Sequence, residues 1–124
     1  MKITTFNPLI VSSHAEDVVR LFEELGFEKR HNPTVETDGR TVVRTRMEDE
    51  NGFHVDVSKL DSIPRDMTVI RMNVDNFDEA YELLTAHGFQ KFPGIEEVNL
   101  ETAKALLMAA PSGFAVELIE HIKK

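Results

Sequence analysis

The sequence predicts an α+β fold made of two copies of a β-α-β-β-β unit, and an internal repeat is the main observation behind this prediction. Leu25-Gly26-Phe27 resembles His87-Gly88-Phe89, 62 positions later, and Asn51-Gly52-Phe53 resembles Ser112-Gly113-Phe114, 61 positions later. Two unrelated stretches at nearly the same offset indicate an internal duplication. The second observation is that helical and strand-like periodicities follow one another in the same order in both halves.

The length suits a single domain. The chain has 124 residues, which is ordinary for one domain with its own hydrophobic core. We therefore expect one domain over residues 1–124, with module 1 at about 1–61 and module 2 at about 62–124.

The first module opens with an apolar strand and a helix. Residues 6–11 are strand-like, and Pro8 suggests an edge or a bulge. Residues 13–16 have the spacing of a capping box. One predicted helix face then follows at i, i+3, i+4 and i+7, and Gly26 suits the residue that ends the helix. This face consists of Val18, Leu21, Phe22 and Leu25.

The second module repeats this plan. Residues 69–74 are strand-like, Asn76 and Glu79 can cap a helix, and Gly88 can end it. The predicted buried face of this helix consists of Phe77, Ala80, Tyr81 and Leu84.

Strands are expected after each helix. Residues 41–47 and 53–57 form a predicted hairpin in module 1, and residues 114–119 form the last strand of module 2. Residues 101–110 are rich in Ala, Leu, Lys and Met, which favours a helix by propensity. Their counterpart in the repeat is the strand 41–47, so we predict a strand, because tertiary context often overrides propensity. Residues 29–37 and 91–98 can each hold one further strand.

Composition excludes several classes of protein. The 22 acidic residues outnumber the 14 basic ones, giving a net charge of −8, so we expect no binding to nucleic acid or to an anionic membrane. Cysteine is absent, which excludes disulfides, thiolate metal sites and thiol catalysis. No stretch is apolar enough for a membrane span and residues 1–5 do not resemble a signal peptide, so a cytoplasmic location is expected.

The duplicated unit resembles the vicinal oxygen chelate superfamily, which includes glyoxalases, bleomycin-resistance proteins and dioxygenases. The resemblance rests on the superfamily's "LGF" turn after each helix, here Leu25-Gly26-Phe27 and His87-Gly88-Phe89. It also rests on the strand Pro111-Ser112-Gly113-Phe114-Ala115-Val116-Glu117-Leu118. It implies an incomplete eight-stranded, mostly antiparallel barrel whose concave side forms a cup for a metal or a small molecule. It also implies a homodimer.

In metal-dependent members of this superfamily, the first and last strands of each module supply the ligands. The matching first-strand positions here are Phe6 and Val69, whose side chains carry no donor atom. A one-residue slip offers Asn7 or, in module 2, Thr68 and Ile70, none of which is a good metal donor. The last-strand positions are Asp56 and Glu117. The resemblance therefore implies a degenerate site that keeps two of four donors, and we predict that no metal is bound.

An altered metal set is the alternative. His54 and Asp56 lie two apart on a strand and share a face, so His54, Asp56 and Glu117 could together bind a divalent ion such as zinc, nickel, manganese or iron.

Glu117 is the residue most favoured for a functional role. Its neighbours Val116 and Leu118 should face the helices, so Glu117 should face the cup. It could act as a general base, or it could pair with Arg44, Arg46 or Arg71 and neutralise a buried charge. Arg44 and Arg46 share one strand face and could hold an anionic ligand, or could pair with Glu48 or Asp56.

Two functions follow as hypotheses. The first is a metal-free protein, similar to the bleomycin-resistance branch, that binds a small organic molecule in the cup. The second is a metal-dependent lyase, isomerase or dioxygenase resembling glyoxalase I, so the sequence leaves open whether the protein is an enzyme. The predicted ligand cavity consists of Phe6, His54, Asp56, Val69, Arg71, Phe92 and Glu117.

Overall fold

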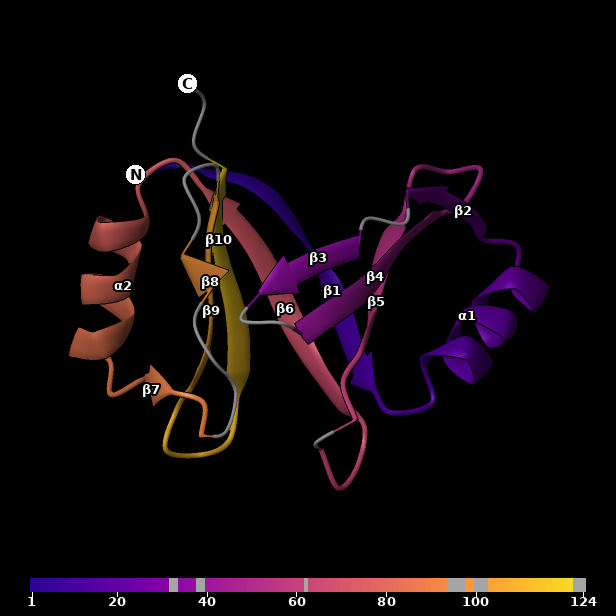
Figure 1. The fold of residues 1–124 in the computed structure, drawn as a ribbon. Helices are drawn as coiled ribbons and strands as arrows, with labels where there is room; N and C mark the ends of the chain where they lie inside the picture. The colour runs from indigo at the N-terminus through magenta and orange to yellow at the C-terminus, as the bar shows by residue number, and fades with distance from the viewer. Residues whose placement is uncertain (32–33, 38–39, 62, 94–97, 100–102, 122–124) are drawn as a thin grey trace. The chain divides into compact units, whose positions relative to one another are not determined.

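A computed structural model shows the α+β architecture that the sequence predicts (Figure 1). It describes residues 1–31, 34–37, 40–61, 63–93, 98–99 and 103–121. These residues form two compact units. One unit consists of residues 7–68, and the other combines residues 1–6 with residues 69–124. The units therefore differ from the predicted modules at about 1–61 and 62–124, because residues 1–6 belong to the same unit as residues 69–124.

Each unit has one helix and the same order of elements. The unit 7–68 holds most of β1 (Ile3–Ser12), then α1 (Ala15–Glu24), β2 (Glu28–His31), β3 (Thr34–Thr37), β4 (Arg40–Glu48) and β5 (His54–Lys59). The unit 69–124 holds most of β6 (Met67–Val74), then α2 (Phe77–Ala86), β7 (Gln90–Lys91), β8 (Val98–Asn99), β9 (Ala103–Ala109) and β10 (Ala115–His121).

Most strand pairs within the units are antiparallel. In the unit 7–68 the order is β2-β4-β5-β1, with β3 beside β4, and only β1 and β5 are parallel among its described pairs. In the other unit the order is β6-β10-β9-β7, with β8 beside β9, and only β6 and β10 are parallel among its described pairs. The parallel pair in each unit joins its first and last long strands.

The segment with high helix propensity forms a strand, as the repeat predicts. β9 pairs with β10 along its whole length, from Ala103 opposite His121 to Ala109 opposite Ala115. Leu106 and Met108 from β9 pack into the core beneath α2. Residues 101 and 102 of the predicted strand lie outside the described residues.

The helix α2 matches its prediction closely. The Asn76 side chain accepts a hydrogen bond from the Glu79 backbone nitrogen at 3.1 Å, and Gly88 ends the helix with φ of +88°. Phe77 and Ala80 are buried in the core, with Tyr81 and Leu84 packed against them. The predicted face is therefore the buried one.

The helix α1 differs from its prediction in two ways. Its buried residues are Ala15 and Val19, with Val18 and Phe22 beside them, whereas Leu21 and Leu25 are more than half exposed. The predicted capping box at 13–16 is wrong, because the N-cap position is His14 and not Ser13, and His14 makes no side-chain cap hydrogen bond. Ser12 instead stabilises the turn before the helix, because its Oγ accepts a hydrogen bond from the His14 backbone nitrogen at 2.9 Å.

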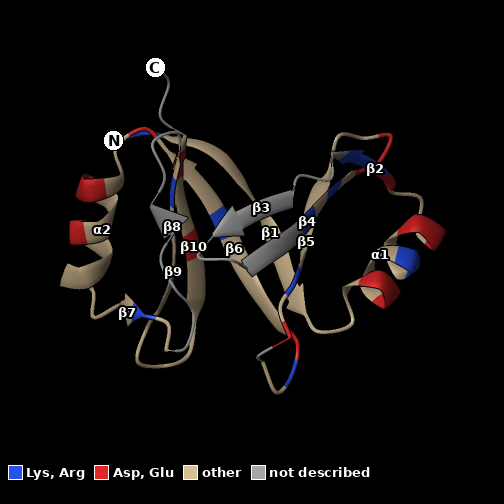
Figure 2. Ribbon diagram, in the orientation of Figure 1, with Lys and Arg blue, Asp and Glu red and all other residues tan. Residues whose placement is uncertain are grey.

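Charged residues lie mainly on the outer surface of each unit. Acidic side chains follow both helices (Figure 2), including Glu16 and Asp17 in the first turn of α1 and Asp78 and Glu79 in that of α2. Carboxylates there interact favourably with the positive end of the helix dipole. No helix in the described part of the chain is both long and apolar enough to cross a bilayer.

Candidate functional site

Each unit carries polar residues on the sheet face opposite its helix. In β10, Leu118 packs into the core under α2, while Glu117 alternates to the other face. In β5, Val55 and Val57 pack under α1, so Asp56 alternates away from the helix in the same manner. The predicted orientation of Glu117 relative to its neighbours is therefore confirmed.

The face of the unit 69–124 contains a buried ion pair. Arg71 on β6 lies directly opposite Glu117 on β10, and its Nε is 3.9 Å from Glu117 Oε1. The two side chains are only 5% and 13% exposed. The buried residues Val69, Leu107 and Ile119 add apolar side chains to the same face, and Asn73, opposite Ile119, adds one buried amide. Of the two roles predicted for Glu117, pairing with an arginine is the one that this geometry displays.

The face of the unit 7–68 contains a second pair. Arg46 on β4 lies opposite Asp56 on β5, with Arg46 Nε 3.4 Å from Asp56 Oδ1. The Asp56 side chain is 1% exposed, whereas that of Arg46 is 36% exposed. Arg44, two residues earlier on the same face, is half-buried and lies opposite Ser58. Each of the two last-strand carboxylates therefore has its own guanidinium.

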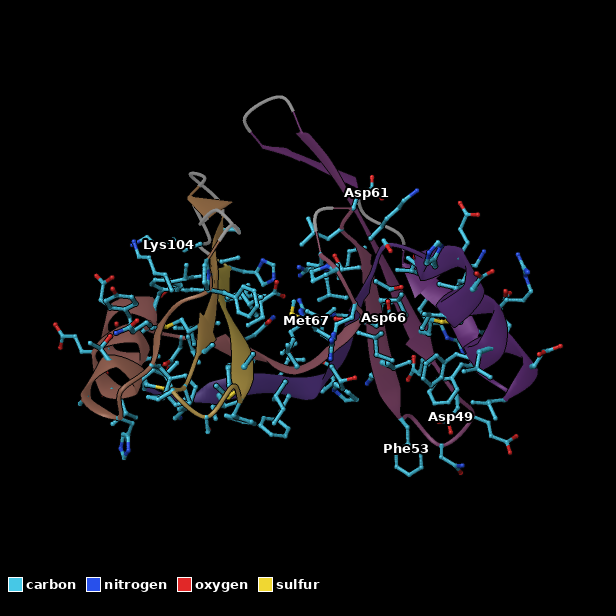
Figure 3. The ribbon with its side chains drawn as sticks, turned by 90° about the horizontal axis from the view of Figure 1, so that it is seen from below. Asp49, Phe53, Asp61, Asp66, Met67 and Lys104 are labelled. Carbon is cyan, nitrogen blue, oxygen red and sulfur yellow. The ribbon has the colours of Figure 1, made fainter. Side chains whose placement is uncertain are left out.

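His54 takes part in a separate polar network at the start of β5. Its Nε2 lies 3.4 Å from Glu48 Oε1, and Arg30 Nε lies 3.5 Å from the other oxygen of Glu48. His54 is exposed while Asp56 is buried, although the two share a strand face. Arg30 and Glu48 also line an open cavity of about 430 Å³ beside the β4–β5 turn. Phe53, at the end of this turn, extends into solvent (Figure 3). The Arg30 contact was not foreseen, because it depends on how β2 pairs with β4.

The first-strand positions carry little that can bind a metal. Val69 is buried, at 3% exposure, and Phe6 is 62% exposed. Strand register pairs Leu9 with Asp56 and Arg71 with Glu117, so Asn7 is the counterpart of Val69 in the other unit. The Asn7 amide is buried; its Nδ2 donates a hydrogen bond to the Pro8 carbonyl at 2.9 Å, and its Oδ1 accepts none from the described residues.

The remaining predicted cavity residue, Phe92, is half-buried and its backbone nitrogen donates to the Leu107 carbonyl at 2.9 Å. His54 and Asp56 belong to one unit and Glu117 to the other. Their convergence as a metal set therefore stays a prediction. Among the described residues of either unit, no three His, Asp or Glu side chains are grouped closely enough to hold a metal ion.

Comparison with solved structures identifies the fold. Methylmalonyl-CoA epimerase from Mycobacterium tuberculosis matches with a TM-score of 0.66 and 10% sequence identity, over 98% of this chain and 90% of that one. Glyoxalase I from Zea mays matches with a TM-score of 0.69 and 13% identity, over 98% of this chain but only 44% of the maize protein. This chain has the vicinal oxygen chelate fold.

A third match comes from the same fold group and has a similar length. A glyoxalase/bleomycin resistance protein/dioxygenase superfamily member from Vibrio splendidus 12B01 aligns over 96% of this chain and 99% of its own, with a TM-score of 0.59 and 15% identity. Neither a scan of protein-family models nor a search of curated proteins finds a match. The predicted vicinal oxygen chelate fold is thus confirmed by structure, at identities that show the fold alone.

Proposed function

We propose that this protein binds a small organic molecule, without a metal ion, on the sheet faces that lie opposite its helices. The observation that carries the proposal is the pairing of both last-strand carboxylates with arginines, Glu117 with Arg71 and Asp56 with Arg46. In the superfamily that the chain resembles, these are two of the positions that supply metal ligands.

The donor chemistry of these residues does not fit a divalent ion. A carboxylate beside a guanidinium already has a positive partner, and a second cation at the same oxygen would be repelled by the first. The first strands add little, because Val69 is aliphatic and Asn7, whose Nδ2 donates to the Pro8 carbonyl, offers a single neutral oxygen, the buried Oδ1. A divalent metal site needs several oxygen or nitrogen ligands that converge on one point.

The same residues suit a polar organic ligand. In the unit 69–124, the Arg71–Glu117 pair and the nearby buried Asn73 amide supply donors and acceptors. The apolar side chains of Val69, Leu107 and Ile119 lie on the same face. Small-molecule sites typically combine such apolar lining with a few polar groups that fix the orientation of the ligand. The pair is also neutral overall, so an uncharged ligand with a carbonyl or amide group matches its charge.

The proposal is tested by a thermal-shift screen of small aromatic and glycopeptide ligands in the presence of EDTA. We expect at least one saturable hit, whose affinity does not change when zinc, nickel or manganese replaces EDTA. Glu117→Gln should weaken that hit at least about 10-fold, while Glu82→Gln on the exposed surface of α2 serves as the control. A screen with no hits, or a hit that requires metal, would contradict the proposal.

A further inference from the structure

A second cavity lies in the unit 7–68, on the face of its sheet that α1 covers. Its volume is about 480 Å³, within the range of small-molecule sites. The buried side chains of Ala15, Val19 and Val57 line it. Val57 alternates with Asp56 along β5, so this cavity and the Arg46–Asp56 pair lie on opposite faces of the sheet.

The cavity exists where the other unit places large side chains. Val57 lies opposite Thr45 in the unit 7–68, and the residues at the equivalent positions of the other unit are Leu118 and Leu106. Measured from the helix-end glycines, Ala15 corresponds to Phe77 and Val19 to Tyr81. The Phe77 and Tyr81 rings are stacked, with centroids 6.4 Å apart. Four bulky residues beneath α2 are therefore replaced by Ala, Val, Val and Thr in the unit 7–68.

The charge at the helix start is also reversed between the two units. In the unit 69–124, Glu120 Oε1 accepts a hydrogen bond from the backbone nitrogen of Phe77, the first residue of α2. By the same 61-residue offset, the counterpart of Glu120 is Lys59, which lines the cavity. The helix α1 begins at Ala15 without a side-chain cap hydrogen bond. A carboxylate in one unit is thus replaced by an ammonium group in the other.

Both differences indicate the same kind of ligand. An aromatic ring would occupy the volume that Phe77 and Tyr81 fill in the other unit. A carboxylate on that ligand would take the place of the Glu120 carboxylate, near the first turn of α1 and opposite Lys59. The rim carries Arg20, Lys29 and Lys59 together with Glu16 and Glu23. Because Arg20 lies 3.6 Å from Asp17, we assign the contact with the ligand carboxylate to Lys59.

We propose that this cavity binds a small aryl carboxylate, with its ring against Ala15, Val19 and Val57 and its carboxylate beside Lys59. This site is independent of the one proposed above, because it uses different residues on the opposite sheet face. A ligand at one site can therefore be distinguished from a ligand at the other by the residues whose signals move.

The test is a titration of the full chain with 3-phenylpropanoate, followed by the backbone amide signals in NMR. We expect saturable binding with a dissociation constant of about 1 mM or tighter, as the size of the ligand allows. The shifts should centre on Ala15, Val19 and Val57. The uncharged 3-phenylpropanamide should bind at least about 10-fold more weakly.

Two variants separate the ring contact from the charge contact. Lys59→Met should weaken the carboxylate about 10-fold and leave the amide unchanged, whereas Arg65→Met, an exposed change in the same unit, should alter neither. Val19→Tyr restores the ring that α2 carries and should abolish binding of both probes. If Val19→Tyr does not fold, Lys59→Met still decides the matter.

Three results would overturn the proposal. The first is the absence of saturation at 10 mM 3-phenylpropanoate. The second is equal affinity for the carboxylate and the amide, or no effect of Lys59→Met. The third is a set of shifted signals that centres on Arg71 and Glu117 instead of on α1.

Discussion

The buried pair Arg71–Glu117 allows a quantitative prediction. Replacing Arg71 by Met leaves the Glu117 carboxylate, which is 13% exposed, without its guanidinium. Removing one partner of a buried ion pair typically costs about 3–5 kcal/mol. The separation of 3.9 Å exceeds that of a charge-assisted hydrogen bond, about 2.7–2.9 Å, so we expect the lower end, about 3 kcal/mol.

This loss can be expressed as a change in melting temperature. Unfolding entropy is about 2.1 cal/mol/K per residue near 60 °C, or about 0.26 kcal/mol/K for this chain. A loss of about 3 kcal/mol therefore lowers Tm by about 12 °C. Urea unfolding followed by circular dichroism gives the free energy, and a thermal melt of the same samples gives Tm.

The matched control is an exposed pair of the same type. Arg20 Nη1 lies 3.6 Å from Asp17 Oδ1, and both side chains are about 70% exposed, so Arg20→Met should cost less than about 1 kcal/mol. The double variant Arg71→Met/Glu117→Leu removes both buried charges and should return to within about 1 kcal/mol of the parent. If Arg71→Met costs no more than Arg20→Met, the argument that Glu117 depends on its arginine is refuted.

Three further predictions concern the helix ends. Asn76→Ala removes the acceptor for the Glu79 backbone nitrogen and should lower the free energy of unfolding by about 1 kcal/mol in urea, whereas no measurable loss would show that the cap is unimportant. Ser12→Ala removes hydrogen bonds to the His14 nitrogen and to Asp66 Oδ1, and should cost about 1–3 kcal/mol in the same assay, a larger effect than Asn76→Ala. Gly26→Ala places a Cβ at φ of +105° and should destabilise by about 1 kcal/mol, although no atom lies within 4 Å of that Cβ; an equal or higher Tm would contradict the strain argument.

The repeat predicted more of the fold than local propensity did. The segment that became β9 has the composition of a helix, yet Ala103–Ala109 forms a strand between β10 and β7. Its Leu106 and Met108 contribute to the core under α2, and its pairing with β10 satisfies its backbone groups. Long-range contacts of this kind are invisible to single-residue propensity, but the matching strand in the first half revealed them.

The face of α1 shows where periodicity was insufficient. The helix carries two overlapping apolar stripes, one through Leu21 and Leu25 and one through Ala15 and Val19, and Val18 and Phe22 belong to both. The second is the buried stripe, and Leu21 and Leu25 are exposed. Helical periodicity alone does not determine which of two neighbouring apolar stripes is buried, because that depends on the side chains of the sheet against which the helix packs.

The sequence predicted which sheet face the Glu117 side chain lies on, but it did not single out the residue that pairs with it. Alternation along β10 correctly directed Glu117 away from α2, and Arg71 was among the partners considered. The correspondence between the first strands depends on register, which pairs Leu9 with Asp56 and so aligns Asn7 with Val69. Counting back 19 residues from Gly26 and from Gly88 gives the same alignment, so matching Phe6 with Val69 was one residue out, and the one-residue slip to Asn7 is the correct alignment.

The central claim, that the last-strand carboxylates are held by arginines and bind no metal, is tested most directly by elemental analysis. Protein purified without chelator or added metal should contain substoichiometric metal that washes out. Addition of nickel, zinc or manganese should leave Tm unchanged. A divalent ion near one per chain that survives washing and is lost in Glu117→Gln would contradict the account.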